Sequence, residues 1–457
     1  MMRSLFSLCA LLIVFPVIVK GSFAPDYKNL NWNGLDIVYV KDDRLPTYSV
    51  SIYFADGALS DQKGKEGETE LMFDLLTSGT RRFSQKEIND NLEYYGANYG
   101  HSLTHEFATY SVSGLLKDIV PTVKQICHVF DDATFPKSEL KKIKKLKQNA
   151  LKNIVNNHGK VADRAFRQLS LSGSVYETPS SGTVKSIGRV YQKDLVKKLK
   201  YFKEKVKKRV YIKGPEGVQK IKEILTHDCG FNFKTGQFMR KVESALYSKK
   251  NNAGIYLITV PGANQAQLRI GRLLHKNEIN NHALLLFTSK FLGGGFTSQL
   301  MKSVRVKAGL SYSVSAFAAG QKEYGRSGIM TFTKNETINE LLDVVRGTLD
   351  AVVDGKFTAD EFEQNRGYLV GSFPFSFESS SHFMESLIQL DHQERPHDDL
   401  FGLPSQLEKI KSKDVSLMTG MIFDWSKQTI VIVGPKSLQK KLKKFGKVKV
   451  LSYKNFL

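Results

Sequence analysis

The amino-acid sequence predicts an α+β protein made of two homologous halves, each with an antiparallel-rich sheet packed on helices. Three observations support this fold class: segments that recur at a fixed separation, short strand-like runs in both halves, and long helical patterns between those runs. The chain has 457 residues, of which 41% are hydrophobic and 25% are charged. A chain of this length and composition has enough material for two to four domains with sizeable cores.

The repeat consists of short segments that match in the same order along both halves. The matched pairs are GANY (96–99) with GLSY (309–312), FPKSEL (135–140) with FTADEF (357–362), QKDLV (192–196) with SKDVS (412–416), and VYIKGP (210–215) with IVIVGP (430–435). Their separation stays between 213 and 222 residues. A single match this short is weak evidence, but several in register indicate a duplicated unit.

Strands are predicted where β-branched and aromatic residues form short, partly alternating runs. These runs are DIVYV, YSVSIYF and FATYSVSGL in the first half, and IYLITV, AQLRIGRLL and SGIMTFT in the second. Helices are predicted between them, for example at 67–80 and at 336–355, where a glycine ends the pattern. Hairpins and meanders interspersed with such helices are typical of an α+β layout.

The chain divides into four predicted segments. A signal peptide is expected at 1–21, an N-terminal domain at 22–230, a polar and weakly patterned linker at 231–253, and a C-terminal domain at 254–457. The two domains correspond to the two halves of the repeat.

The leader has the layout of a secretory signal peptide. Arg3 precedes an apolar run from Leu5 to Val19, and small residues follow, with cleavage expected after Gly21 or Ala24. An uncleaved membrane anchor is the alternative, but the run is short for a membrane span. We therefore expect an exported protein, periplasmic if the source is bacterial and otherwise secreted. After cleavage it would not span a membrane, because no later segment is long and apolar enough.

Two cysteines remain once the leader and Cys9 are removed. Cys127 and Cys229 could pair in an oxidising compartment, although two cysteines do not form a disulfide framework. Cys127 lies in the apolar helical pattern TVKQICHVF. We therefore expect it to be a buried free thiol.

The chain is strongly basic, with 67 Lys and Arg residues against 45 Asp and Glu residues and a formal net charge of +22. Lysines cluster at 140–153 and 193–209, with apolar residues between them at helical spacing. This pattern indicates solvated faces of amphipathic helices. Attraction to acidic peptides or anionic envelope surfaces stays open, whereas nucleic-acid binding is not expected because no module for it is present.

Residues 291–317, FLGGGFTSQLMKSVRVKAGLSYSVSAF, contain the most specific motif. The segment resembles the pitrilysin/insulinase-type zinc peptidases, the inverzincins, and especially their small two-domain, processing-peptidase-like branch. Their motif reads roughly L-G-G-G-x-x-S-x-L followed by V-R-x-x-x-G-L-x-Y-S-V. The opening NGLDIVYVKDDRLPTYSVSIYFADGALSD also resembles the first hairpin of that family. The resemblance covers nearly all of the mature chain and implies two domains that close like a clam shell.

In this family the first-half helix carries H-x-x-E-H, in which two histidines bind zinc and the glutamate is the general base. Aligning the chain on Gly79-Thr80 places the histidine positions at Glu70 and Asp74 and the base at Phe73. Phenylalanine cannot accept a proton, so the general base would be missing.

The third zinc ligand has no counterpart either. The resemblance implies a glutamate about 76 residues after the motif, but the corresponding segment, 147–155, reads KQNALKNIV and contains no acid. Zinc prefers nitrogen and sulfur donors and needs three protein ligands at a catalytic site. We therefore expect no metal, and no cofactor, in this chain.

The second half keeps the positions that the resemblance links to substrate. Arg305 and Tyr312 stand seven residues apart, as in family members that bind the substrate backbone and steady the tetrahedral intermediate. A guanidinium offers several fixed donors to a carbonyl, and a tyrosine hydroxyl can donate to a developing oxyanion. The alternative is that the pair only packs a turn.

Four further histidines are possible metal ligands by residue type. His101 and His105, with Glu106 adjacent, fall in a predicted strand, where positions four apart share a face, but they lack a third ligand. His392 and His397 are predicted to lie in a loop. We expect all four to be ordinary polar residues.

The sequence leaves three functions open. The first is an exported non-catalytic subunit of a heterodimeric zinc peptidase. In it, a homologous partner carries the zinc site, and this chain supplies Arg305 and Tyr312 to bind the peptide substrate. The second is a non-proteolytic peptide-binding or scaffolding protein with the same fold. The third is a divergent metallopeptidase that uses Glu70 and Asp74.

Overall fold

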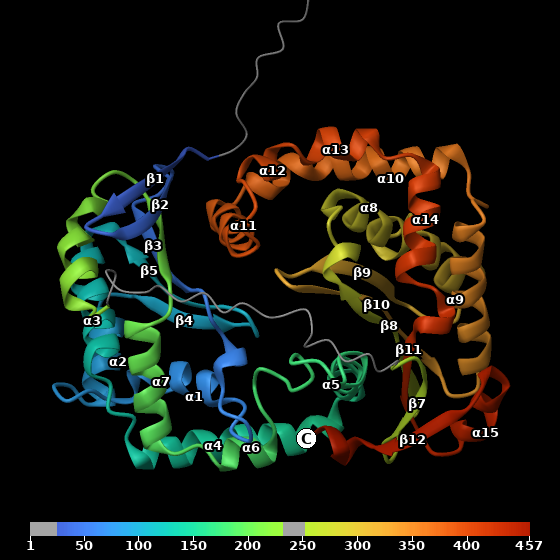
Figure 1. Ribbon diagram of the computed structural model, residues 1–457, viewed down its shortest axis with the longest axis horizontal. Helices are drawn as coiled ribbons and strands as arrows, with labels where there is room; N and C mark the ends of the chain where they lie inside the picture. Colours follow the sequence, from blue (N-terminus) through green and yellow to red (C-terminus); the bar gives the residue numbers. More distant parts are fainter. Residues whose placement is uncertain (1–24, 232–251) are drawn as a thin grey trace, which may run out of the picture.

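The computed structural model describes residues 25–231 and 252–457, and it shows two α/β halves that lie side by side (Figure 1). The predicted signal peptide and nearly all of the predicted linker lie outside the described residues. The two sheets lie inside the molecule, and most of the helices form its periphery (Figure 1).

Each half contains one six-stranded sheet with corresponding strand order, β1-β2-β6-β3-β5-β4 in the first and β12-β7-β11-β8-β10-β9 in the second. The strands are β1 (Tyr27–Trp32), β2 (Leu35–Lys41), β3 (Thr47–Phe54), β4 (Asn98–Leu103), β5 (Ala108–Leu115), β6 (Lys208–Gly214), β7 (Gly254–Thr259), β8 (Gln265–His275), β9 (Val314–Gly320), β10 (Tyr324–Lys334), β11 (Thr429–Gly434) and β12 (Val448–Ser452).

The pairing within the two sheets confirms the predicted repeat and fold class. In the first sheet β2 is parallel to β6, and the pairs β6-β3, β3-β5 and β5-β4 are antiparallel. In the second sheet β7 is parallel to β11, and the pairs β11-β8, β8-β10 and β10-β9 are antiparallel. The sheets differ at one edge, because β1 is antiparallel to β2 whereas β12 is parallel to β7.

The helices follow the same repeat. They are α1 (Glu68–Asp74), α2 (Gln85–Tyr94), α3 (Ile119–Asp132), α4 (Lys137–Lys152), α5 (His158–Ser170), α6 (Val184–Gly188), α7 (Gln192–Glu204), α8 (His282–Gly293), α9 (Ile338–Val353), α10 (Ala359–Ser372), α11 (Ser380–His392), α12 (Asp398–Phe401), α13 (Leu403–Lys409), α14 (Ser412–Ile422) and α15 (Leu438–Leu442). A π-helical segment, η9 (Met301–Lys307), follows the glycine-rich stretch.

Two equivalent helices are exchanged between the halves. α5 belongs to the first half by sequence but packs on β8 and β11 of the second sheet, where Phe166 is buried with Tyr256 and Val431. α11 belongs to the second half but packs on the first sheet, where Phe383 is buried with Val38. Each half therefore completes the core of the other.

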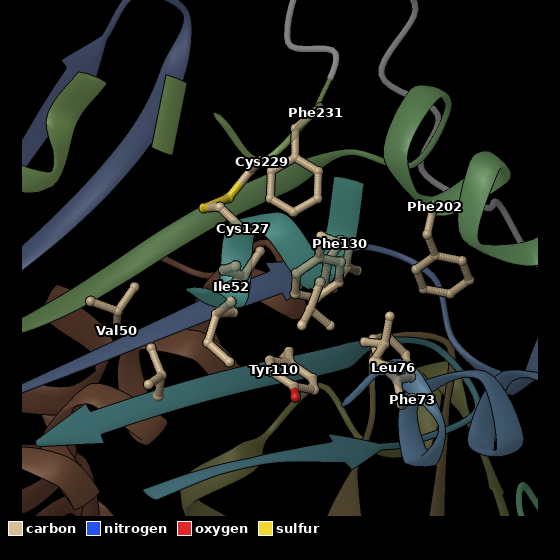
Figure 2. Packing of buried hydrophobic residues seen from close by; sticks show 14 of the residues in the cluster. Val50, Ile52, Phe73, Leu76, Tyr110, Cys127, Phe130, Phe202, Cys229 and Phe231 are labelled. Carbon is tan, nitrogen blue, oxygen red and sulfur yellow. A yellow bond between two sulfur atoms is a disulfide. The ribbon is translucent and has the colours of Figure 1, made fainter. Parts of the chain in front are cut away.

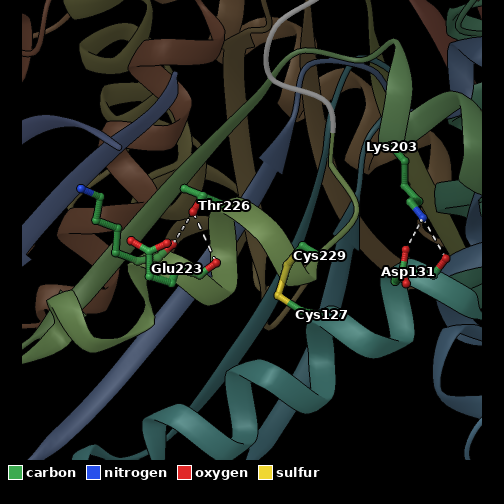
Figure 3. The surroundings of a disulfide bond; sticks show 7 residues. Cys127, Asp131, Lys203, Glu223, Thr226 and Cys229 are labelled. Atoms are coloured by element: carbon green, nitrogen blue, oxygen red, sulfur yellow. Dashed lines mark hydrogen bonds and ion pairs between the residues drawn. A yellow bond between two sulfur atoms is a disulfide. The ribbon is translucent and has the colours of Figure 1, made fainter. Parts of the chain in front are cut away.

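Cys127 is buried, as predicted, but the prediction that it is a free thiol is wrong. Cys127 of α3 forms a disulfide with Cys229, and both residues are buried (Figure 3). The bond forms because the segment Ile224–Asp228 packs beside α3 and brings the end of the first half to it. Nearby, the Nζ atom of Lys203 lies 3.1 Å from Oδ1 of Asp131, which adds an ion pair between α7 and α3.

None of the helices within 25–231 and 252–457 has both the length and the apolar character needed to cross a bilayer.

Candidate functional site: a degraded metal position and an arginine–tyrosine pair

Buried ionic contacts fix the start of α1. Lys198 of α7 lies 3.4 Å from Oε2 of Glu68 and 3.5 Å from Oδ1 of Asp61, and all three side chains are almost fully buried. Asp61 also accepts hydrogen bonds from the backbone N–H groups of Gly67 and Thr69. Gly67 has φ +95°, a conformation that suits glycine. α1 is therefore rigidly placed against α7.

The side chains at the two predicted histidine positions meet a lysine. The Nζ atom of Lys147, on α4, lies 3.2 Å from Oε1 of Glu70 and 2.6 Å from Oδ2 of Asp74. His101 of β4 approaches from the other side, with Nε2 3.6 Å from Glu70 and 3.9 Å from Asp74. All four side chains are half-buried. We call Glu70, Asp74, His101 and Lys147 the α1 cluster.

In the α1 cluster, opposite charges stabilise the ionised forms of Glu70 and Lys147. Burial alone would raise the pKa of Glu70, but His101 and the ammonium of Lys147 together hold it below its ordinary value. Burial alone would lower the pKa of Lys147, but Asp74 and Glu70 raise it above its ordinary value. Glu70 is therefore an anion and Lys147 a cation at neutral pH.

Phe73, at the predicted position of the general base, belongs to the hydrophobic core and is 2% exposed. Its ring stacks on His101 at 5.4 Å. It meets Phe202 of α7 edge-on at 5.6 Å (Figure 2). Tyr110 of β5 lies on another side at 6.2 Å. The side chain packs α1 against the sheet and offers no proton acceptor.

The α1 cluster does not fit zinc. Glu70, Asp74 and His101 place one donor atom each within 4.8 Å of one another, so three ligands are at hand. The ammonium of Lys147 already lies between the two carboxylates and would repel a divalent cation there. With two carboxylate ligands, one imidazole, a resident ammonium and no base, the cluster lacks the donor set of a catalytic zinc site.

Sequence reasoning missed both His101 and Lys147 as members of this cluster. The prediction that His101 and His105 share a strand face is wrong, because β4 ends at Leu103 and His105 lies in the following turn. His105 is instead bonded to the carbonyl of Thr178, with Nε2 2.7 Å from that oxygen. Lys147 is the first residue of the segment 147–155, which was expected to supply an acidic third ligand. A basic residue in place of an acid was the one signal in the sequence that could have placed Lys147 in this cluster.

His392 was predicted to lie in a loop, and this prediction is wrong. The residue lies in the last turn of α11. Its Nε2 lies 3.0 Å from Oε2 of Glu106, and its Nδ1 lies 2.9 Å from the hydroxyl of Tyr53. Glu106 also accepts hydrogen bonds from the Tyr176 hydroxyl and the backbone N–H of Lys322. This network joins the two halves, because Glu106 lies between β4 and β5 of the first half and Lys322 between β9 and β10 of the second.

Arg305 and Tyr312 lie together at the end of η9. The guanidinium of Arg305 is 4.3 Å from the centre of the Tyr312 ring and 5.3 Å from that of Phe296. Both rings are 74% exposed, so the stacked group faces solvent. α1 packs on α4, α7 and β4, whereas η9 packs on α9 and β9, so the pair and the α1 cluster are carried by different halves.

The fold and the α1 cluster together define a class of protein. It is a two-domain, peptidase-like fold in which the ammonium of Lys147 occupies the position of the metal. The chain matches "Insulinase (Peptidase family M16)" over residues 36–179 and "Peptidase M16 inactive domain" over residues 190–369, together more than half of its length. The protein belongs to the insulinase-type M16 peptidase family, as the sequence motif predicted.

Similar proteins include the "Non-peptidase homolog YmxG" of Helicobacter pylori, 21% identical over 401 residues that cover 85% of this chain and 89% of that protein. The "Uncharacterized zinc protease YmxG" of Bacillus subtilis is 19% identical over 351 residues, 76% of this chain and 84% of that protein. The crystal structure of a peptidase M16 inactive domain from Pseudomonas fluorescens has a TM-score of 0.79 at 21% identity, covering 90% of this chain and 98% of that one.

Proposed function

We propose that this protein is the exported, non-catalytic subunit of a heterodimeric zinc peptidase. A homologous partner supplies the zinc site, and this chain supplies Arg305 and Tyr312 for binding the peptide substrate. The observation that carries the proposal is the α1 cluster, in which an ammonium lies between the two side chains that would have to bind zinc. A chain built this way cannot activate water at that position by itself.

The arginine–tyrosine pair, whose tyrosine ring faces solvent, supports a role in substrate binding. The half-buried guanidinium of Arg305, held against two exposed aromatic rings, loses little further freedom when it bonds a peptide carbonyl. Tyr312 remains free to donate from its hydroxyl, because none of the hydrogen bonds among the described residues involves that group. A purely structural pair would be expected to be buried.

The Cys127–Cys229 disulfide supports export. Disulfides form and persist in oxidising compartments such as the periplasm and the exterior of cells, and are rare in the cytosol. The signal-peptide layout of residues 1–21 points in the same direction.

The test is affinity purification of the tagged protein from its own cells, followed by peptidase assays on the purified complex. We expect a near-stoichiometric homologue that carries H-x-x-E-H. Arg305→Ala should lower kcat/KM of the complex at least tenfold without dissociating it, since a charge-assisted hydrogen bond contributes about 1.5–3 kcal/mol.

The matched control is Arg346→Ala, which removes an exposed arginine of α9 whose ring neighbour is Trp425. It should leave kcat/KM unchanged. Recovery of the chain alone, or unchanged turnover by Arg305→Ala, would contradict the proposal. Recovery with a complex that has no peptidase activity would favour the scaffolding function.

A divergent metallopeptidase is the second candidate, because three donor atoms do converge at the α1 cluster. Its test is the metal content of the isolated protein after dialysis against zinc. One equivalent of tightly held zinc would favour this candidate, whereas no retained metal would agree with the non-catalytic subunit.

A further inference from the structure

A cavity of about 460 Å³ lies where the two halves meet, away from the arginine–tyrosine pair. The turn after β4 and the loop at 179–181 form one side, helix α5 a second, and Gln321 and Tyr324 of the second half a third. Its lining includes exposed residues of α5, Lys160 and Asp163, so the cavity reaches solvent.

Positive charge gathers at this cavity. Arg164, Arg167 and Lys160 of α5 line it directly. Arg326 of β10 stands two residues from Tyr324 of the lining, with its guanidinium 5.3 Å from the ring centre of Phe166. Burial and the charge of Arg167 lower the pKa of both Arg164 and Arg326 to about 10, so Arg167 lies close enough to each of the other two guanidiniums to repel it.

The two acids in the lining form their direct contacts with groups other than these arginines, although the charge of Asp163 acts on Arg326 from a distance. Oδ1 of Asp163 lies 2.6 Å from Nε of Arg269. Glu106 is bonded to Tyr176, His392 and the backbone of Lys322. The remaining lining group that could carry charge, His105, is neutral near pH 7, because burial and then the charge of Arg167 lower its pKa to about 4.

The arginines themselves lack anionic partners among the described residues. Among the described residues, Arg164 donates to two backbone carbonyls, those of Gly182 and Phe456, and to no carboxylate. Within 25–231 and 252–457, Arg167 and Arg326 form neither a side-chain hydrogen bond nor an ion pair, and Nε of Arg326 is buried without a partner. An uncompensated charge in a partly buried site is costly unless a ligand completes it.

We propose that this cavity is a binding site for a small oxyanion, a carboxylate or a phosphate, held by Arg167 with Arg326 and Arg164 behind it. Guanidinium groups present paired donors that match the two oxygens of a carboxylate or phosphate. The apolar side chains of Leu103, Ile154 and Pro179 in the same lining suit a ligand with an apolar portion. The C-terminal carboxylate of a short peptide has this combination, and free phosphate shares only the anion.

The test measures binding by fluorescence anisotropy with two labelled pentapeptides of alanine and leucine, one ending in a free carboxylate and one in a carboxamide. We expect the carboxylate form to bind the protein at least tenfold more tightly. Arg167→Ala should reduce its affinity to that of the carboxamide, and Arg167→Lys should restore part of it. Arg189→Ala, an exposed arginine outside the cavity, is the matched control and should change neither affinity.

Inorganic phosphate is the second probe. If both peptides bind equally but phosphate raises the Tm of the wild type and not of Arg167→Ala, the site takes a free oxyanion and the proposal holds with that ligand. If neither the carboxylate nor phosphate depends on Arg167 in a variant that melts like the wild type, the proposal is overturned. The assay needs neither a partner subunit nor turnover, so its failure is separate from that of the proposed function.

Discussion

Lys147 is the residue on which the chemistry of the α1 cluster depends. Its ammonium supplies one positive charge between two carboxylates, and it begins the segment 147–155 in which the family resemblance implies an acid. The neighbouring donors, including an imidazole, are still present. A single side chain therefore separates this cluster from a set of four metal donors.

We predict that Lys147→Glu turns the α1 cluster into a zinc site. Removing the ammonium and adding a carboxylate leaves Glu70, Asp74, His101 and the new acid around one point. After dialysis against zinc, the variant should retain about one equivalent of metal, and the wild type should retain none. Metal content by mass spectrometry checks this.

Lys145→Glu, an exposed change on the same helix, is the matched control and should not retain zinc. Peptidase activity should stay absent even in the zinc-loaded Lys147→Glu variant, because Phe73 still replaces the base. Equal zinc in wild type and Lys147→Glu would contradict our interpretation of the cluster.

At this scale the sequence predicted only part of the site. It identified Glu70, Phe73 and Asp74 because a motif fixed their spacing. It could not identify His101 or Lys147 as their neighbours, because β4 and α4 approach α1 only in the folded chain. His101 was noticed but paired with the wrong residue, since the strand ends two residues before His105.

At the scale of elements, α11 is tied to the first sheet by a charged contact as well as by its apolar face. Asp391 accepts a hydrogen bond from the Tyr211 hydroxyl, and its Oδ1 lies 2.6 Å from Nη1 of Arg209. Burial alone would raise the pKa of Asp391, but hydrogen bonds from His397, Arg209 and Tyr211 lower it to about 2.

Acid should therefore loosen α11. Because the pKa of Asp391 is lower in the folded protein than in the unfolded chain, its contribution to stability is complete above about pH 5 and is lost as pH falls towards 2. We predict that Asp391→Asn lowers the free energy of unfolding by about 1–3 kcal/mol at pH 7. The difference from the wild type should shrink between pH 5 and pH 2.5.

Thermal unfolding at several pH values checks this prediction. The control is Asp398→Asn, the same change at an exposed aspartate of α12. A difference between Asp391→Asn and the wild type that stays constant down to pH 2.5 would show that the contact does not depend on ionised Asp391.

The disulfide acts on a second element, the segment that ends the first half. It closes a loop with a sequence separation of 102 residues. Loops of this size predict a stabilisation of about 2–5 kcal/mol. We predict that Cys127→Ala with Cys229→Ala lowers the free energy of unfolding by that amount, and that reductant does the same to the wild type.

Chemical denaturation with and without reductant provides the measurement. Reductant should have no effect on the double variant, which serves as the control. Identical stability of the oxidised wild type and the double variant would contradict the prediction. The sequence did not decide whether this bond forms. The apolar pattern around Cys127 is the same for a buried free cysteine as for a buried cysteine in a disulfide.

At the scale of the whole molecule, the repeat was predictable and the exchange of helices was not. Matching segments such as VYIKGP and IVIVGP fixed the correspondence of β6 and β11. The apolar faces of α5 and α11 were equally visible, but a pattern along the chain does not say which sheet will cover a face. That choice depends on the arrangement of the two halves in space (Figure 1).

We predict that the chain can be split without losing its shape. Fragments 25–241 and 242–457, produced together, should co-purify in a 1:1 ratio, because α5 and α11 each bury apolar side chains in the core of the opposite fragment. Size-exclusion chromatography and light scattering check the stoichiometry.

Phe383→Asp places a charge in one of these contacts and should separate the fragments. Tyr368→Asp, on an exposed site of α10, is the control and should not. Two fragments that elute as independent, folded monomers would contradict the exchange.

The reciprocal placement of α5 and α11 has a consequence for how such a chain can arise. Each half offers the helix that the other needs, and the two helices occupy equivalent places in the repeat. Two copies of one ancestral half could therefore form a domain-swapped homodimer. The protein has the architecture of that dimer after gene fusion, with one copy free to lose a metal site while the assembly keeps its interface.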